Sequence, residues 1–361
     1  MLHHAAAAAM KVRFLLGWKR RKARLAWQNY WNNRRCSKNE KRFLIIRHHK
    51  SGPRTFDLLL KWVDRHVPEI RGRFELQSLP CTKLDLSRHS ACVFWLGDPV
   101  QDWSETAYRQ AKELAARCRV EGIPIVNDVE KFTNATKCLG AKLIGGVGFR
   151  TPVTKEITDI PRFRRDLSGM ELPVLIREDW GHTRPTFRVD SMEDLQHVPI
   201  ETLHRPIVVE FIDVLSADGL YRKCRYFAAG PRGVTHHLQV KDDWLTKGKG
   251  QVMRDDIRAE EIDYLCCPDP HHDMFQRARE ALGLDTVAFD YGYTPSGETI
   301  IWEANPFPLI HFPFAANRQH RRPAIDRTFA AIVKLYCELA NIDSPPMLDQ
   351  LLAYEEADCP Q

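Results

Sequence analysis

The stretch FDYGYTPSGETIIWEANP, Phe289–Pro306, decides the fold, because it places two acids and an amide on an expected β-hairpin. Both VAFDYGY and ETIIWEA are rich in β-branched and aromatic residues, and the residues between them have turn chemistry. Asp290 and Glu303 supply carboxylate oxygens, and Asn305 adds an amide oxygen on the same strand face as Glu303. Mg²⁺ prefers such hard ligands and keeps coordination places for phosphate.

The loop of this hairpin decides whether the two acids meet. A two-residue loop, Ser296-Gly297, would set Asp290 directly opposite Glu303. A three-residue loop that also includes Pro295, with a bulge, would offset the acids by one position. The sequence leaves both registers open, and two acids beside a hairpin are also compatible with solvated strand ends.

Length and charge limit the classes of protein. A chain of 361 residues is longer than a typical domain, so we expect two or three lobes. Residues 1–39 hold ten Lys or Arg and no acid, whereas the remaining residues hold 43 basic against 47 acidic side chains, a net charge of −4. The body of the protein is therefore not an obvious nucleic-acid binder, and no specific nucleic-acid partner is predicted.

The ten cysteines are scattered without a CxxC pair, so neither a zinc knuckle nor a disulfide framework is expected. No apolar run approaches the roughly 18 residues that cross a bilayer. Reduced thiols and a cytoplasmic location are the resulting expectations.

Residues 1–40 are predicted to form a basic helical extension that combines Trp18, Trp27, Tyr30 and Trp31 with a cluster of Lys and Arg over residues 19–24. Through residues 11–31 it could lie on an anionic membrane surface or on RNA. Two alternatives stay open: a solvated helix that packs its Trp residues on the body, and an upstream extension of a start at Met10.

From residue 41 the chain alternates between expected strands and helices, which predicts a small parallel-sheet α/β lobe over residues 41–127. A central lobe at 128–205, a C-terminal lobe at 206–340 and a polar tail at 341–361 follow. In the C-terminal lobe, the apolar strand PIVVEFID precedes LYRKCRYFAAG, in which Lys223 and Arg225 share a face. Such a basic strand suits either a phosphate contact or a charged outer sheet face.

Together these segments, over roughly residues 127–339, resemble the ATP-grasp superfamily, and most of all a poorly characterised, peptide-ligase-like branch. The resemblance implies a mixed α/β and α+β architecture, in which an N-terminal parallel-sheet lobe precedes two lobes that clamp ATP. The D…ExN pattern of the family falls on Asp290, Glu303 and Asn305, which are thereby implied as ligands of Mg²⁺ or Mn²⁺.

The other implied contacts are to the nucleotide. VVEFID is similar to the strand against which adenine lies, so the base would contact Glu210, Phe211 and Ile212, with Asp213 or Asp218 near the ribose. Phosphate contacts fall on Lys137, Arg177 and Arg225, and the last two are the implied catalytic residues. The chain departs from the family pattern at Arg177, where lysine is commoner, and in the loop EDWGHTRP, where Gly181 is the only glycine.

The resemblance implies an ATP-dependent carboxylate-amine or carboxylate-thiol ligase. A small-molecule or peptide carboxylate attacks the γ-phosphate, and an amine or thiol then displaces phosphate from the acyl phosphate. Electrostatic stabilisation and positioning suffice for this reaction, without a protein nucleophile. Two other hypotheses remain. One is an ATP-dependent small-molecule kinase, and the other is a catalytically weakened nucleotide-binding scaffold, with the glycine-poor loop EDWGHTRP as the weakened part.

Overall fold

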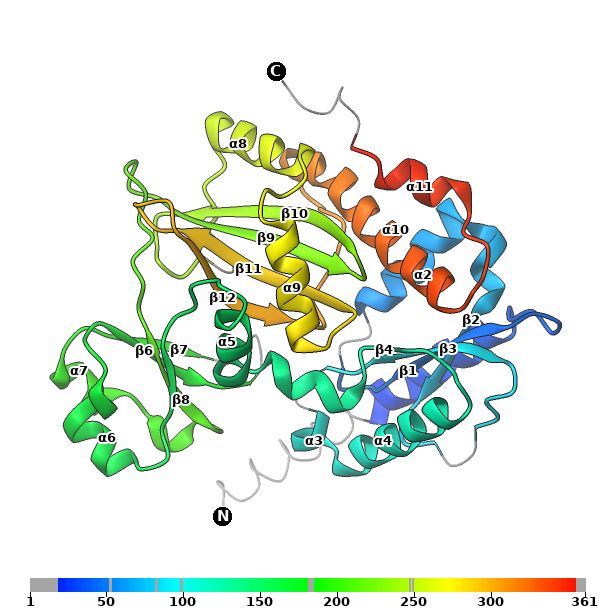
Figure 1. Cartoon of the computed structure of the whole chain (residues 1–361), viewed down its shortest axis with the longest axis horizontal. Coiled ribbons are helices and arrows are strands. Elements are labelled where there is room, and N and C mark those ends of the chain that lie inside the picture. The colour runs from blue at the N-terminus through cyan, green and yellow to red at the C-terminus, as the bar shows by residue number, and fades with distance from the viewer. Residues whose placement is uncertain are drawn as a thin grey trace, which may run out of the picture. The chain divides into compact units, whose positions relative to one another are not determined.

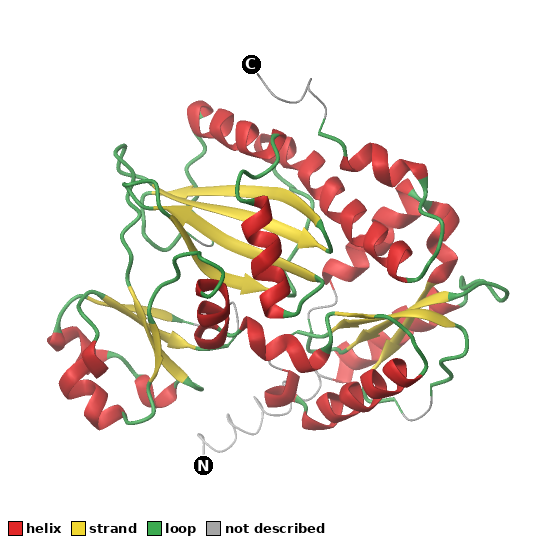
Figure 2. Cartoon of the chain, in the orientation of Figure 1, coloured by secondary structure: helices red, strands yellow, loops and turns green. Residues whose placement is uncertain are grey.

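The computed structural model describes residues 19–51, 54–81, 84–97, 100–180, 185–246, 248 and 250–354 (Figures 1 and 2). It forms two compact units. One unit runs to Val129 and includes Tyr336–Met347, and the other comprises Glu130–Leu335 and the residues from Leu348 onward. No helix in the described ranges is both long enough and apolar enough to span a membrane.

The first unit is built on a four-stranded parallel sheet with strand order β2-β1-β3-β4 (Figure 1). Its central strand contains the apolar run Phe43–Ile46, which is completely buried, as expected for a parallel sheet covered on both faces. The small parallel-sheet lobe predicted from the alternating pattern is therefore confirmed. Its elements are β1 (Arg42–Arg47), α2 (Arg54–His66), η1 (Pro68–Arg73), β2 (Phe74–Ser78), β3 (His89–Trp95), α3 (Val100–Trp103), α4 (Glu105–Val120) and β4 (Ile125–Val126).

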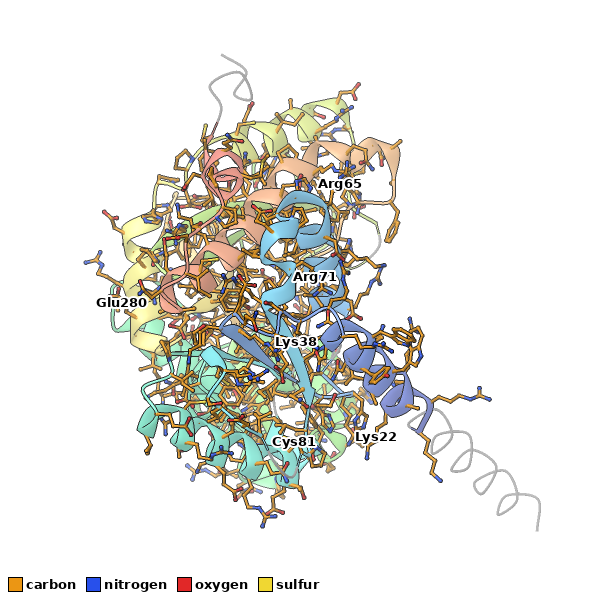
Figure 3. The ribbon with its side chains drawn as sticks, turned by 90° about the vertical axis from the view of Figure 1, so that its right-hand side faces the viewer. Lys22, Lys38, Arg65, Arg71, Cys81 and Glu280 are labelled. Atoms are coloured by element: carbon orange, nitrogen blue, oxygen red, sulfur yellow. The ribbon has the colours of Figure 1, made fainter. Side chains whose placement is uncertain are left out.

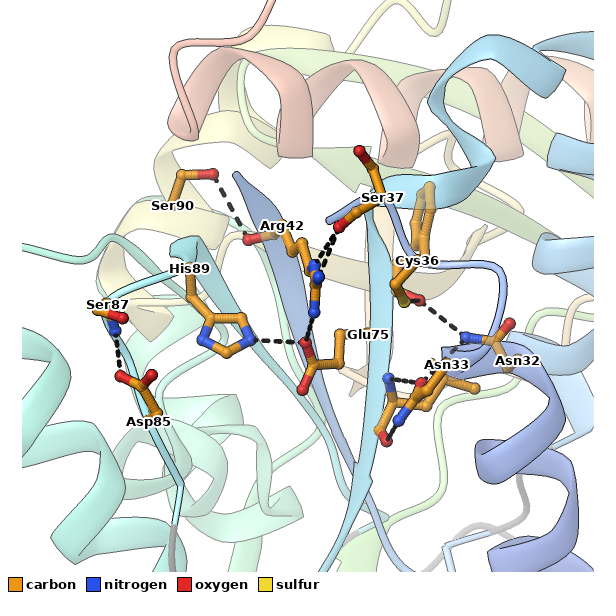
Figure 4. A network of polar contacts seen from close by, with 12 residues as sticks. Asn32, Asn33, Cys36, Ser37, Arg42, Glu75, Asp85, Ser87, His89 and Ser90 are labelled. Atoms are coloured by element: carbon orange, nitrogen blue, oxygen red, sulfur yellow. Dashed lines mark hydrogen bonds and ion pairs between the residues drawn. The ribbon is translucent and has the colours of Figure 1, made fainter. Parts of the chain in front are cut away.

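A polar contact connects three strands of this sheet. Arg42 on β1 donates to Glu75 on β2 over 2.7 Å, and His89 on β3 lies 3.3 Å from the same carboxylate (Figure 4). The contact with His89 and the charge and hydrogen bond of Arg42 lower the pKa of Glu75 to about 2, although burial opposes the shift. Glu75 is therefore an anion that links neighbouring strands.

The N-terminal extension is helical over its described residues 19–33, and it packs asparagines on the edge strand β2. Asn33 donates to the Leu76 carbonyl over 2.9 Å and accepts from the Leu76 N–H over 2.8 Å (Figure 4). Asn32 donates to the Phe74 carbonyl over 2.8 Å. These amides satisfy main-chain groups that an edge strand leaves without a strand partner.

The second unit contains two antiparallel sheets. The first, with strand order β5-β8-β6-β7, packs against α6 and α7 around a core that includes Phe163, Leu195 and Val208. Strand β8 pairs with β5 and β6, so it joins this sheet although it follows the boundary predicted after residue 205. The elements are α5 (Lys137–Gly145), β5 (Thr154–Glu156), α6 (Ile160–Asp166), β6 (Val174–Glu178), β7 (Thr186–Val189), α7 (Met192–His197) and β8 (Pro206–Glu210).

The other antiparallel sheet has the strand order β10-β9-β11-β12, and α9 crosses one of its faces (Figure 1). On that face Phe275 stacks on Tyr226, with ring centroids 4.3 Å apart, and also contacts Phe289. The elements are β9 (Tyr221–Ala229), β10 (Arg232–Lys241), α8 (Asp255–Cys266), α9 (His272–Leu282), β11 (Thr286–Tyr293), β12 (Thr299–Asn305), α10 (Arg322–Leu339) and α11 (Pro346–Leu352). Helix α11 lies in the segment that the sequence suggested to be a polar tail.

The asparagine contact generates a stability prediction. Asn33→Ala removes both side-chain partners of the buried Leu76 main chain and should destabilise the first unit by about 1–3 kcal/mol. Hydrogen exchange of the β2 segment should become faster than in the control Lys19→Ala, which changes an exposed residue of the same helix. Equal protection of β2 in both variants would show that the asparagine does not stabilise the edge strand.

Candidate active site

The hairpin formed by β11 and β12 brings the two predicted acids together. The turn is longer than either loop considered from the sequence, since Thr294 N–H bonds the Glu298 carbonyl and Tyr293 pairs with Thr299. This turn alone would place Trp302 opposite Asp290, but the register shifts between Asp290 and Tyr291, and Asp290 pairs directly with Glu303. A β-bulge at Trp302 therefore sets the register, as bulges do beside many functional sites.

The bulge depends on a close approach at Gly292. A Cβ atom at this position would lie 2.5 Å from Cη2 of Trp302 and 2.9 Å from the Arg222 carbonyl oxygen. The absence of a side chain therefore leaves space for the bulged indole.

Asp290 is paired with two cations from the neighbouring strand β9. Arg225 donates from Nε to Asp290 Oδ1 over 2.6 Å and from Nη2 to Oδ2 over 3.0 Å. Lys223 donates from Nζ to Oδ2 over 2.9 Å. Burial alone would raise the pKa of Asp290, but the charges of Arg225 and Lys223 outweigh it and lower that pKa to about 2. The carboxylate is therefore ionised and held in one orientation.

Two further cations come from strand β6 of the other sheet and from helix α5. Arg177 on β6 is half-buried, with Nη2 3.9 Å from Glu303 Oε2, and no group in the described ranges accepts a hydrogen bond from its Nε. Burial lowers the pKa of Arg177, and Glu303 and Asp179 oppose that shift. Lys137 opens helix α5 after the N-cap Thr136, and its Nζ donates to the Asp179 carbonyl over 3.3 Å.

These side chains line a cavity of about 280 Å³ between the two antiparallel sheets. Its wall contains most of the site residues predicted from the sequence: Lys137, Arg177, Glu210, Phe211, Ile212, Arg225, Asp290, Glu303 and Asn305. Cations from α5, β6 and β9 thus face two carboxylates and an amide from the hairpin.

Asp213 and Asp218, predicted to lie near a ribose, are not among the residues that line the cavity. Asp218 is exposed and accepts two hydrogen bonds from Arg222, which lower its pKa to about 2. Asp213 is also exposed and accepts from the Leu215 N–H. A ribose contact from either acid stays a prediction.

The cavity also contains residues that were not among the predicted site residues. Lys223 shares the strand face of Arg225, as its spacing of two in the sequence indicated, although of the two only Arg225 was predicted as a site residue. Trp244 follows β10 in the chain, and its ring meets Phe211 edge to face at 6.0 Å. Gln239 lines the wall, and no described group bonds its Oε1. No sequence spacing indicates Trp244, because only the folded sheet brings it to β8.

The donor set at the hairpin fits a hard divalent cation. Among the described residues, no group of three or more His, Cys, Asp or Glu side chains is suited to a metal. Asp290, Glu303 and Asn305 nevertheless line one cavity, where the Asn305 amide oxygen also accepts from the Phe307 N–H over 2.9 Å. Mg²⁺ needs only one or two carboxylates besides phosphate and water. Residues 181–184 of the loop EDWGHTRP, with Gly181 among them, lie outside the described residues.

The Asp290 contacts generate a stability and pH prediction. Asp290→Asn leaves Arg225 and Lys223 partly unneutralised in a buried site and should cost about 3–5 kcal/mol of unfolding free energy. The matched control is Asp218→Asn, which breaks an exposed Asp–Arg pair and should cost much less. Denaturant unfolding of both variants measures the difference, and equal losses would contradict the account.

The sign of the pH effect follows from the folded-state pKa of Asp290, which is about 2 and lies below the ordinary value of 3.8. The contribution of Asp290 to stability should be fully present above about pH 4 and should disappear as the pH falls through about 2. Asp290→Asn should therefore flatten this part of the stability profile, whereas an unchanged profile would exclude Asp290 as its source.

Comparisons with known proteins support the architecture. No protein-family model and no curated protein sequence matches the chain. The structure is similar to that of D-alanine–D-alanine ligase from Bacillus anthracis, with a TM-score of 0.53 and 13% identity over 83% of this chain and 97% of that one.

Two further solved structures have comparable scores. For the B. anthracis ligase complexed with ATP, the TM-score is 0.53 at 11% identity, covering 84% of this chain and 99% of that one. For VanG D-Ala:D-Ser ligase from Enterococcus faecalis, it is 0.52 at 13% identity, covering 84% and 100%. At these identities the likeness concerns the fold, and it confirms the fold that the sequence resemblance implied: the chain has the ATP-grasp fold.

Proposed function

We propose that the chain is an ATP- and Mg²⁺-dependent ligase that activates a carboxylate for attack by an amine or a thiol. The observation that carries the proposal is the convergence of four cations with the two carboxylates and the amide of the hairpin on one cavity between two antiparallel sheets. The similar solved structures are ligases by name, and one of them was solved with ATP.

The residues of the cavity wall are of two chemical kinds, as a nucleotide requires. Phe211, Ile212 and Trp244 give an apolar and aromatic wall beside the main chain that follows β8, which suits an adenine ring. Lys137, Arg177, Lys223 and Arg225 give a cationic wall, which suits a triphosphate. ATP is proposed to lie with its base toward Phe211 and its phosphates toward Arg177 and Arg225.

The cations also suit the transfer step. The substrate carboxylate oxygen forms a bond to the γ-phosphorus as the bond to ADP breaks, which gives an acyl phosphate. Arg177 and Arg225 would offset negative charge on the transferred group from opposite sides of the cavity. Asp290 already orients Arg225 and Lys223, so little rearrangement of these cations is needed.

The second step requires no protein nucleophile. An amine or thiol attacks the acyl carbon, phosphate leaves, and the nucleophile loses its proton. Asp290, Glu303 and Asn305 would hold a divalent cation, Mg²⁺ or Mn²⁺, and such a cation polarises phosphoryl oxygens when bound. The proposed substrates are small-molecule or peptide carboxylates and amines.

Replacing one proposed metal ligand tests the reaction. Glu303→Gln keeps the size of the side chain but removes its charge, and should lower ADP formation at least about a hundredfold, as loss of one charge-stabilising group commonly does. The control is Glu298→Gln, which alters an exposed acid of the same hairpin that pairs with Arg150, and it should retain activity. Wild-type turnover in Glu303→Gln would refute the assignment of Glu303.

The substrate is tested by screening ADP release over amino acids, peptides and small polyacids with ATP and Mg²⁺. A ligase releases ADP and phosphate together with a joined product. A kinase would release ADP with a phosphorylated product and no free phosphate. Nucleotide binding without ADP formation against every acceptor would instead favour the scaffold hypothesis.

Arg177 is tested by binding, independently of turnover. Arg177→Met removes a half-buried cation of the cavity wall and should weaken binding of a non-hydrolysable ATP analogue about tenfold or more, measured by calorimetry. Arg162→Met is a suitable control, because Arg162 is an exposed residue of α6 and is outside the cavity lining. Unchanged affinity in Arg177→Met would place the phosphates elsewhere.

A further inference from the structure

The N-terminal helix exposes its aromatic residues and buries its amides, the reverse of an ordinary surface helix. Its three exposed ring side chains are Trp27 at 62%, Tyr30 at 57% and Trp31 at 49% of their full accessible area. Asn29 and Asn32 are buried on the other side, and Asn29 donates to Ser78 over 2.7 Å. Trp27, Tyr30 and Trp31 are therefore not packed on the body, which was one of the alternatives left open by the sequence, and Trp18 lies outside the described residues.

The exposed residues form one continuous stripe. Arg20, Arg24, Trp27, Trp31 and Arg34 recur at intervals of three and four, which places them on one face of an α-helix. Lys22 marks the N-terminal part of this helix in Figure 3, where the helix extends beside the parallel sheet. We call the stripe together with Tyr30 the outer face of the helix.

The rings of the outer face pack on one another. Trp31 meets Trp27 and Tyr30 edge to face, with centroid separations of 6.1 and 5.6 Å. The Arg34 guanidinium lies 5.5 Å from the Trp31 ring centroid and 5.9 Å from that of Tyr30. The three rings thus form one continuous apolar ridge with cations at both ends, and they do not stand apart from one another.

We propose that the outer face of this helix binds the surface of an anionic phospholipid membrane. Trp and Tyr are the side chains enriched at the membrane interface, where the ring enters the headgroup region and the polar group stays hydrated. A convex ridge needs no complementary groove on a flat, deformable surface. A cationic amphipathic helix that binds in this way lies along the membrane without crossing it.

The charge of the segment selects the kind of membrane. Residues 1–39 contain ten Lys or Arg and no acid, so the attraction is to an anionic surface. The sequence before the described helix, MKVRFLLGW, has the same composition of cations with apolar and aromatic residues. RNA is the less suitable partner, because bases stack on accessible ring faces, and the Trp31 ring meets Trp27 and Tyr30 edge to face with the Arg34 guanidinium beside it.

The test is co-sedimentation of the full chain with vesicles. Wild type should bind vesicles made of equal amounts of phosphatidylserine and phosphatidylcholine, should not bind phosphatidylcholine vesicles, and should lose binding as salt is raised. Tryptophan emission should shift to shorter wavelength on binding. Trp27→Ala with Trp31→Ala should lower the partition coefficient about tenfold or more, because the interfacial rings are lost.

Charge is tested separately. Arg20→Ala with Arg24→Ala should lower partitioning by about fivefold for each arginine removed. The matched control is Phe314→Ala, since Phe314 is 84% exposed and is an aromatic residue of the other unit. This control should bind as wild type does, and the thermal unfolding of all variants should stay close to wild type because each replaced side chain is exposed.

Three results would overturn the proposal: absence of binding to anionic vesicles, wild-type binding by the double tryptophan variant, or binding to an oligouridylate in preference to vesicles. None of them bears on the ligase proposal, because ADP formation by the cavity residues is measured without vesicles.

Discussion

The site depends on the buried ion pair between Asp290 and the two cations of β9. Arg225 and Lys223 each donate to this carboxylate, and the three side chains lie on paired strands of one sheet. Lys223 and Arg225 carry like charges on one strand face and would repel each other. The acid on the neighbouring strand compensates this repulsion. The same acid belongs to the oxygen set proposed for the metal. One carboxylate thus couples the cations proposed to bind phosphate to the oxygens proposed to bind the metal.

The second constraint is the bulge in the hairpin. The turn between β11 and β12 would otherwise place Trp302 opposite Asp290, and Glu303 would then point to the other face of the sheet. Insertion of one extra residue restores the pairing of the two acids, and Gly292 provides the space for the displaced indole. Arg177 approaches Glu303 from the other sheet, so the bulge also determines which cation meets which acid. Strand register, in this chain, determines the electrostatics of the cavity.

Much of the fold could be predicted, because it follows from local patterns. Strand β1 is a continuous apolar run, as buried parallel strands are, and Asn305 follows Glu303 at the spacing that puts both on one face. The register of the hairpin could not be predicted, since it depends on contacts of Trp302 and Gly292 that the sequence does not display. Trp244 was missed because its position beside Phe211 is a tertiary contact. The exposure of Trp27 and Trp31 could not be predicted either. It follows because Asn32 and Asn33 occupy the side of the helix that faces β2, where they bond its main-chain groups.

The proposed function requires that the cavity between the two antiparallel sheets holds a nucleotide through its cationic and acidic side chains. The most direct measurement is a crystal structure of the full chain with Mg²⁺ and a non-hydrolysable ATP analogue. The account predicts a triphosphate in contact with Lys137, Arg177 and Arg225, and a metal ion bound by Asp290, Glu303 and Asn305. A nucleotide bound elsewhere on the chain, or a cavity without nucleotide at saturating concentration, would contradict it.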